Sequence, residues 1–216
     1  MNQKTTNSIP LPSLQAIMPV VVVDAVDQGL AITNGLLLGG IRQIEITLRT
    51  PSALQACEAI ARDAPQCLLA VGTVLSVIDM DNAVQAGAQL LISPGLSNRL
   101  AEHAHLKSLP WIPGVATATD MMNARDWGYH TLKFFPAMAA GGPSALKALS
   151  APLHDLTFIP TGGIGLADLP AWKALPSVQG VGGSWLTANL QGLNLSEIER
   201  TVAERASQAL KQWQQA

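Results

Sequence analysis

The chain has 216 residues, of which 48% are hydrophobic and only 13% charged, and its formal net charge is -2. A chain with this charge lacks the basic surface that nucleic acid or an anionic membrane requires, so we expect neither as a partner. No apolar run reaches the roughly 18 residues that span a bilayer. The length suits one compact domain with a sizeable core, and we expect residues 1–216 to form it.

The N-terminal segment and the number of cysteines bear on the cellular compartment of the protein and on its thiol chemistry. Residues 1–13 are polar and lack the charged-then-apolar order of a signal peptide, which predicts a cytoplasmic protein. Cys57 and Cys67 are the only cysteines, too few for a disulfide framework and not in a metal-ligand spacing. His103 and His105 have no further ligand nearby in the sequence. We therefore expect reduced thiols and no metal site.

Short apolar segments alternate with amphipathic segments of about a dozen residues, a pattern typical of βαβ units and a parallel sheet. Strands are predicted at residues 18–23, 43–48, 68–73, 90–93, 111–114, 131–135, 157–161 and 178–182. The predicted helices include residues 25–38, 52–63, 77–86, 98–107, 118–127, 166–173 and 196–212, with Ser196 as a cap. Eight strands favour a closed (β/α)8 TIM barrel with a short N-terminal extension. An open doubly wound sheet is the alternative, but its glycine-rich motif is absent, as is a P-loop.

The second predicted strand has a polar face. Polar and apolar residues alternate over 44–49, so Glu45, Thr47 and Arg49 share one face. Because helices cover the outside of a barrel, this face is predicted to point inward, toward the C-terminal mouth. A carboxylate and a guanidinium there suit proton transfer and carboxylate binding. A purely structural Glu45–Arg49 ion pair is the alternative.

Lys133 lies in the apolar segment 131–136, where a strand would bury its ammonium group. Alternation places Thr131, Lys133 and Phe135 on one face, so Lys133 is predicted to face the same interior as Glu45. An apolar site favours the neutral amine, which can attack a carbonyl and form an imine. A buried stem with a solvated head is the alternative for an isolated lysine. With an acid/base and an arginine beside it, this lysine indicates carbon–carbon cleavage of a 2-keto acid.

Other loops at the C-terminal ends of the strands complete the pattern. The third predicted strand ends in Gly72-Thr73, where the Thr73 hydroxyl could bind a substrate oxygen or cap the next helix. Glycine-rich segments 160–165 and 182–185 follow the seventh and eighth strands. In a TIM barrel these two loops usually bind phosphate, since glycines expose backbone N–H groups and a following helix N-terminus adds a favourable dipole. We therefore predict a phosphate site there.

Together these segments resemble the class I 2-keto-3-deoxy-6-phosphogluconate (KDPG) aldolases, a family also credited with 4-hydroxy-2-oxoglutarate (KHG) cleavage. The resemblance covers nearly the whole chain and rests on EITLRT (45–50), GTVL (72–75), ISPG (92–95), IPG (112–114), LKFFPA (132–137), PTGG (160–163) and GGSW (182–185). It implies a homotrimer of barrels that needs no metal or organic cofactor. It also implies that Lys133 is the Schiff-base lysine and Glu45 the acid/base. The implied substrate-binding residues are Arg49 and Thr73 at the pyruvate carboxylate, Pro94 and Phe135 along the pocket, and Gly162, Gly163 and Ser184 at the phosphate, with Thr161 nearby.

Two positions depart from the family pattern. Gly165 stands where similar sequences often carry a serine, and Met138-Ala139 replaces a more polar pair. The first could weaken a hydrogen bond on the phosphate side, and the second could alter the loop that covers the site. Neither touches Lys133 or Glu45.

The sequence predicts a retro-aldol reaction in which Lys133 forms an imine and Glu45 transfers protons. A phosphosugar isomerase or epimerase would instead use Glu45 as a base and Lys133 only electrostatically. A non-catalytic barrel would bind a phosphorylated keto acid without releasing pyruvate. The preferred substrate stays open among KDPG, its galactonate epimer and unphosphorylated KHG.

Overall fold

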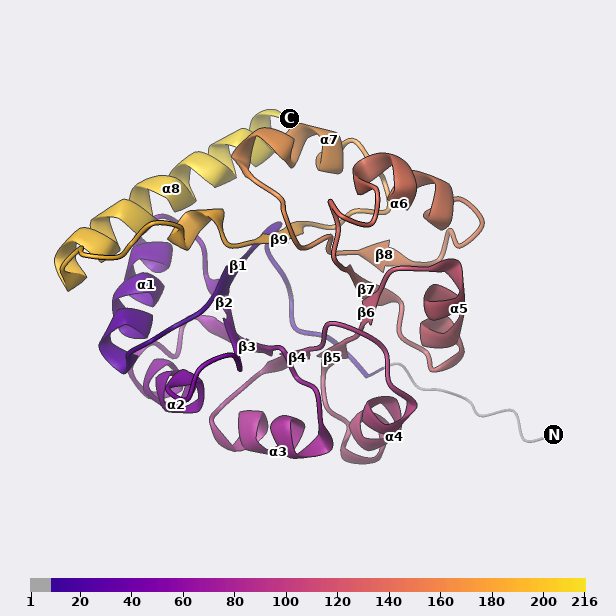
Figure 1. Ribbon diagram of the computed structural model, residues 1–216, viewed down its shortest axis with the longest axis horizontal. Helices are drawn as coiled ribbons and strands as arrows, with labels where there is room; N and C mark the ends of the chain where they lie inside the picture. Colours follow the sequence, from indigo (N-terminus) through magenta and orange to yellow (C-terminus); the bar gives the residue numbers. More distant parts are fainter. Residues whose placement is uncertain (1–8) are drawn as a thin grey trace.

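A computed structural model describes residues 9–216, in which strands alternate with helices. The strands surround a common centre and the helices form an outer layer (Figure 1). The strands are β1 (Ile17–Val21), β2 (Gln43–Thr47), β3 (Leu68–Gly72), β4 (Leu90–Ile92), β5 (Trp111–Ile112), β6 (Gly114–Val115), β7 (Thr131–Phe134), β8 (Thr157–Phe158) and β9 (Val181–Gly183). The α-helices are α1 (Val26–Leu38), α2 (Ala53–Asp63), α3 (Val77–Gln85), α4 (Asn98–Lys107), α5 (Ala118–Asp126), α6 (Gly142–Ser150), α7 (Leu169–Lys173) and α8 (Leu195–Gln215). Short 3-10 helices cover Leu166–Asp168 and Trp185–Thr187.

The strands form two parallel sheets, one with the order β5-β4-β3-β2-β1-β9 and the other with the order β6-β7-β8. Only Pro113 separates β5 from β6 in the chain. At the other edges, isolated parallel bridges join Phe158 to Val178 and Thr161 to Gly182. The result is an α/β fold whose parallel strands curve around one interior, as the alternation of segments predicts.

The predicted strands are present, and three of them differ from the prediction by an interruption or by more than one or two residues at an end. The strand predicted at 111–114 is divided, because Pro113 has no N–H to give to a ladder. The strand predicted at 157–161 ends at Phe158, shortly before Pro160, which likewise has no N–H to donate to a ladder. The strand predicted at 178–182 begins only at Val181 and continues to Gly183.

The helices add one element to the prediction and correct one cap. Helix α6 is not among the predicted helices, and Pro143 lies in its first turn. Proline is well suited to the first turn of a helix, where an N–H would have no partner. For α8 the predicted cap is wrong: the Asn194 side chain, not Ser196, accepts the N–H of Glu197 at 3.0 Å. Among residues 9–216 no helix is long and apolar enough to cross a membrane.

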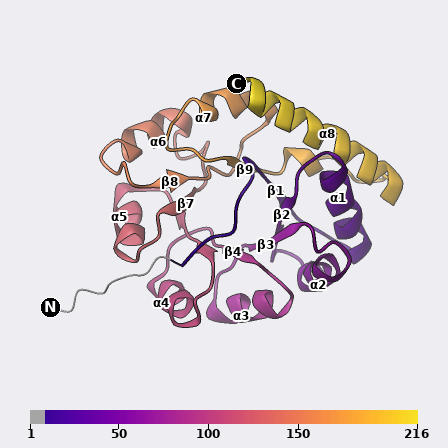
Figure 2. The ribbon, with the colours of Figure 1, turned by 180° about the vertical axis from the view of Figure 1, so that it is seen from behind.

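Alternate strand residues have different neighbours. On β2, Ile44 and Ile46 belong to the main apolar core, which also contains buried side chains of the surrounding helices. A second apolar cluster lies on the inner side and consists of Met18, Ala70, Leu90, Ile92, Ile112 and Ile159, with Leu11 and Leu14 packed against it. The segment that precedes β1 therefore crosses the inside of the strand ring, as Figure 2 shows from behind.

Candidate active site

Lys133 on β7 and Glu45 on β2 form a buried ion pair. The Lys133 Nζ and Glu45 Oε1 atoms lie 2.9 Å apart, although the residues are 88 positions apart in the sequence. The lysine side chain is 8% exposed and the glutamate side chain 2%. Glu45 thus pairs with Lys133, and the alternative ion pair with Arg49 does not form in the described part of the chain. The two strands bring a candidate nucleophile and a candidate base into direct contact.

Two glycines make room for this pair. At Gly72 on β3, a Cβ atom would collide with Glu45 Oε1. Gly114 on β6 lies opposite Lys133 in the register, and a Cβ atom there would collide with the Pro94 carbonyl group. A larger residue at either position would therefore displace Glu45 or the loop that carries Pro94.

Arg49 and Thr73 lie together just beyond the ends of β2 and β3. Arg49 is exposed, and its Nε donates to the Thr73 hydroxyl over a long 3.4 Å. Thr73 has a φ of 60°, a left-handed conformation that costs about 1–2 kcal/mol for a residue with a Cβ. The cap of α3 is Ser76, so Thr73 is not a helix cap. The strained backbone instead holds the threonine hydroxyl beside the guanidinium.

Phe135 connects the lysine to the glycine-rich loops. Its ring centroid lies 5.4 Å from Lys133 Nζ. A Cβ atom at Gly162 would lie 3.3 Å from two carbons of the same ring. Thr161 is buried and bridges to Gly182, so the loop after β8 runs beside β9. The Phe135 ring thus lies between the ammonium group and the glycine-rich loop after β8.

The glycine-rich loops expose backbone donors. Gly162 and Gly163 have φ values of 106° and 77°, which side chains disfavour. The N–H groups of Gly163 and Ser184 find no acceptor among residues 9–216. Both groups are available to an anion. Met138 lies against this loop, because a Cβ atom at Gly163 would come within 3.0 Å of the Met138 Cβ.

One backbone donor beside the glycine-rich loop after β8 is already occupied. The Gly165 N–H, at the start of that segment, donates to Asp168 Oδ2 at 2.8 Å. A carboxylate of the chain itself therefore already satisfies this donor. The sequence pattern did not reveal it, because a glycine-rich turn before a helix looks the same with or without an internal acceptor.

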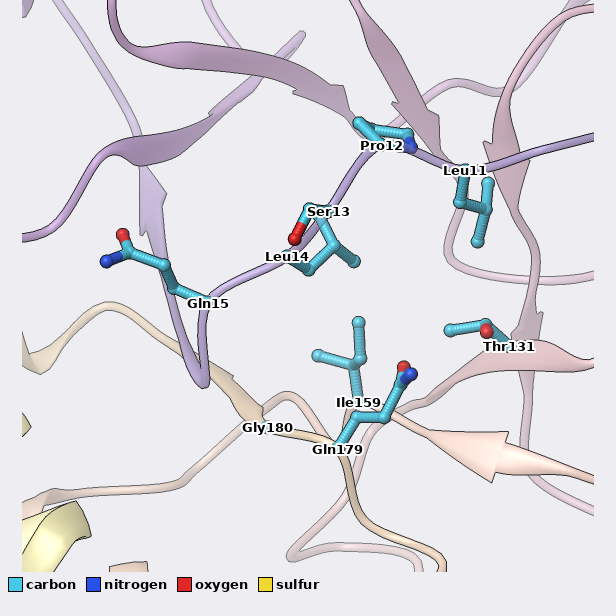
Figure 3. A pocket seen from close by; sticks show the side chains of 9 residues that line it. All are labelled: Leu11, Pro12, Ser13, Leu14, Gln15, Thr131, Ile159, Gln179 and Gly180. Atoms are coloured by element: carbon cyan, nitrogen blue, oxygen red, sulfur yellow. The ribbon is translucent and has the colours of Figure 1, made fainter.

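A cavity of about 340 Å³ lies away from these groups, toward the N-terminal ends of the strands (Figure 3). Residues 11–15 form one side of it, and Thr131, Ile159, Gln179 and Gly180 complete it. Thr131 begins β7, whereas Lys133 lies further along the same strand. No ionisable side chain lines this cavity, so it offers no acid, base or amine.

The histidines and cysteines considered in the sequence do not form a second site in the described residues. No group of three or more His, Cys, Asp or Glu side chains that could hold a metal occurs in the described residues. His103 lies 2.9 Å from Asp81, and His105 lies 2.7 Å from the carbonyl oxygen of Trp127. Cys57 and Cys67 are buried free thiols, and burial raises the pKa of each to about 12.

Comparison with known proteins gives concordant results. A family model described as "KDPG and KHG aldolase" matches residues 12–201. A relative from Escherichia coli K12 named KHG/KDPG aldolase is 41% identical over 170 residues, which are 79% of this chain and 80% of the relative.

Solved structures resemble the chain as well. A KDPG aldolase from Legionella pneumophila, with pyruvate captured as a covalent carbinolamine intermediate, has a TM-score of 0.84 and 35% identity. That match covers 89% of this chain and 92% of the other. A KDPG aldolase from Zymomonas mobilis, solved with 3-phosphoglycerate, also has a TM-score of 0.84 and 35% identity, covering 91% of each chain.

Proposed function

The chain belongs to the KDPG and KHG aldolase family, and from this premise we propose that it is a class I aldolase, a carbon–carbon lyase acting through a Schiff base. It cleaves KDPG to pyruvate and glyceraldehyde 3-phosphate, and KHG to pyruvate and glyoxylate. The observation that carries the proposal is the buried contact of 2.9 Å between Lys133 Nζ and Glu45 Oε1. The site needs no metal or organic cofactor for the steps below.

In the first stage, the Glu45 carboxylate, which lies within hydrogen-bond distance of the Lys133 nitrogen, accepts a proton from the ammonium group. The neutral amine then attacks the C2 ketone of the substrate, and one proton passes from the nitrogen to the ketone oxygen, which gives a neutral carbinolamine. Glu45 returns the proton that it accepted to the carbinolamine hydroxyl, which leaves as water. The product is an iminium ion on Lys133, which withdraws electrons from C3.

In the second stage, Glu45, directly or through a water, removes the proton of the C4 hydroxyl. The C3–C4 bond breaks, its electron pair forms an enamine on Lys133, and C4 leaves as the aldehyde. The proton then returns to C3, which regenerates an iminium ion. One water hydrolyses this ion to pyruvate and free Lys133, replacing the water lost in the first stage.

The remaining predicted residues bind the two ends of the substrate. Arg49 and the Thr73 hydroxyl hold the C1 carboxylate, which suits a guanidinium paired with a hydroxyl donor. Phe135 and Pro94 line the middle of the pocket. Phe135 lies next to Lys133, and Pro94 lies next to Gly114, which is opposite Lys133 on the neighbouring strand. At the distal end, the phosphate contacts these groups: Thr161, Gly162, Gly163 and Ser184. The open N–H groups of Gly163 and Ser184 support this assignment.

The architecture that we propose is a closed (β/α)8 barrel that forms one domain, with β5 and β6 acting as one interrupted strand. Of the predicted domain 1–216, residues 1–8 lie outside the described residues. The two bridges between the β8 and β9 segments support closure. We further propose a cytoplasmic homotrimer. Exposed apolar side chains such as Leu75 and Ile78, both 65% exposed, support burial against another copy. Light scattering of the purified protein measures the number of subunits directly.

Covalent trapping tests the function. The protein is incubated with pyruvate and borohydride, which reduces an imine to a stable amine, and is then analysed by intact and peptide mass spectrometry. We expect one pyruvyl adduct confined to the peptide containing Lys133. A folded protein without an adduct would point to non-covalent isomerisation or to simple binding. Pyruvate release from KDPG and KHG then separates an enzyme from a binding protein.

A further inference from the structure

Asp168 places a negative charge beside the glycine-rich loop that we assign to the phosphate. We propose that Asp168 is a specificity-determining residue, which weakens binding of a phosphate dianion at the distal end of the pocket relative to an uncharged end. The inference rests on the proposed function and concerns which 2-keto acids the same site prefers. The carboxylate contacts neither Lys133 nor Glu45, so it acts on selectivity and not on the reacting atoms.

The geometry brings the carboxylate within electrostatic range. Asp168 Oδ2 accepts the Gly165 N–H at 2.8 Å. Gly165 is only two residues beyond Gly163, so their backbone nitrogens are at most about 7 Å apart. The carboxylate therefore lies within roughly 10 Å of the open Gly163 donor, a distance comparable with the screening length of physiological salt.

The negative charge of Asp168 has little positive charge near it in the glycine-rich loops. No Lys or Arg side chain donates a hydrogen bond to segments 160–165 or 182–185 in the described part of the chain. Arg205 lies nearby, but its guanidinium is bonded to the carbonyl oxygens of Leu186 and Ala188. Met138, which lies against Gly163, is uncharged. The phosphate would thus contact uncharged donors, namely backbone N–H groups and hydroxyls, with a carboxylate as the adjacent charge.

The hydrogen bond itself does not require a charge. A neutral amide oxygen at the same position accepts the Gly165 N–H equally well, so Asp168→Asn removes the charge and keeps the cap. A carboxylate acting on a dianion across about 10 Å of solvent-rich surface changes affinity by roughly 3- to 10-fold. An effect of that size is measurable as a ratio between two substrates.

The matched substrates are 2-keto-3-deoxygluconate and its 6-phosphate, which share a carbon skeleton and differ only in the phosphate. We would measure kcat/KM for pyruvate release from both with the wild type, with Asp168→Asn and with a control variant, Asp120→Asn. Asp120 caps α5 in the same way, accepting the N–H groups of Ala116 and Thr117. Asp120 follows β6, away from the two glycine-rich loops in the order of strands.

For Asp168→Asn we expect the ratio of kcat/KM for the phosphorylated over the unphosphorylated substrate to rise about 3- to 10-fold, and the gain to shrink in high salt. The control is expected to leave the ratio within about twofold of the wild type. Inorganic phosphate should also inhibit Asp168→Asn more strongly than the wild type, and Asp168→Ser supplies a second neutral acceptor if the amide folds poorly.

An unchanged ratio in both folded neutral variants, with pyruvate release intact, would overturn the role of Asp168 while leaving the aldolase function standing. A wild type that releases no pyruvate from either substrate would overturn the proposed function and this inference with it. An equal rise of the ratio in the Asp120→Asn control would also contradict a specific role.

Discussion

Gln43 and Glu45 lie two residues apart on the same inner face of β2 and are both about 1% exposed, yet their surroundings differ completely. The Gln43 amide is saturated by backbone: it accepts the N–H of Gln15 and donates to the carbonyl oxygens of Gln15 and Ile17. Glu45 contacts a single charged side chain from another strand, Lys133. Burial of a polar group alone therefore does not identify a reactive site. A buried ionisable group paired with a second ionisable group, between which a proton can be transferred, is the better indicator.

The same contrast divides the interior. Toward the N-terminal ends of the strands, the inner side is closed by apolar residues such as Met18 and Leu90, with Leu11 and Leu14 packed on them. Toward the C-terminal ends stand Glu45, Lys133 and the Arg49–Thr73 pair. Four substitutions or treatments would break or sharpen this division.

The largest expected effect follows replacement of the lysine. Lys133→Ala is expected to abolish pyruvate release and borohydride trapping, because Lys133 is the amine that we assign to the attack on the C2 ketone. Loss of the ion pair leaves Glu45 buried without its partner and lowers the free energy of unfolding by about 3–5 kcal/mol. Since a typical domain has 5–15 kcal/mol, the fold should survive, as circular dichroism would show. An active Lys133→Ala enzyme would refute the imine mechanism.

Replacement of the carboxylate is expected to slow the proton transfers without preventing the covalent step. For Glu45→Gln we predict a fall in kcat of about 10²- to 10⁴-fold, the usual size of a general acid–base contribution. Trapping of pyruvate on Lys133 should be largely retained. Steady-state kinetics beside peptide mass spectrometry measures both quantities, and a rate equal to that of the wild type would remove Glu45 from the mechanism.

Gln43→Leu is the structural counterpart of that variant, on the same face of the same strand. It leaves the backbone groups of Gln15 and Ile17 without their side-chain partners, which is expected to cost about 1–3 kcal/mol for each buried group left unsatisfied. Urea unfolding would report the lower stability. The kcat of the folded variant should stay near that of the wild type, and a loss comparable with that of Glu45→Gln would contradict the division between the two ends.

The smallest effect concerns the thiols. Burial holds the pKa of Cys57 and Cys67 at about 12, above the usual 8.5 of an exposed thiol, so both should resist iodoacetamide at pH 8 until the protein unfolds. The unfolded chain loses these protons at a lower pH than the folded chain. Stability from this source is therefore complete below about pH 8.5 and falls as the pH rises toward 12. Rapid alkylation of the native protein would contradict the buried environment.

Much of the site was predictable because it depends on local periodicity. Alternation placed Glu45 and Lys133 on inward faces, and the positions of glycines marked the loops after β8 and β9. Periodicity gives no distances between strands, however. It left a structural Glu45–Arg49 ion pair open as an alternative, whereas in the structure the carboxylate pairs with Lys133.

The prediction from local sequence also failed where two residues could each cap the same helix. Ser196 and Asn194 are both good helix caps, and only the path of the chain before α8 decides in favour of Asn194. Helix α6, which begins after Gly141 and carries Pro143 in its first turn, is an element that the predicted helices do not include.

By itself, the sequence determined the alternation of strands and helices, the inward placement of Lys133 and Glu45, and the family to which the chain belongs, because these depend on residue order and on a period of two. The tertiary structure alone decided which ionisable groups touch, that Gln43 is saturated by the segment before β1, and that Asp168 occupies the Gly165 donor. Such contacts join positions that lie far apart in the chain or compete for one partner, and they are selected by packing and by the need to satisfy buried polar groups.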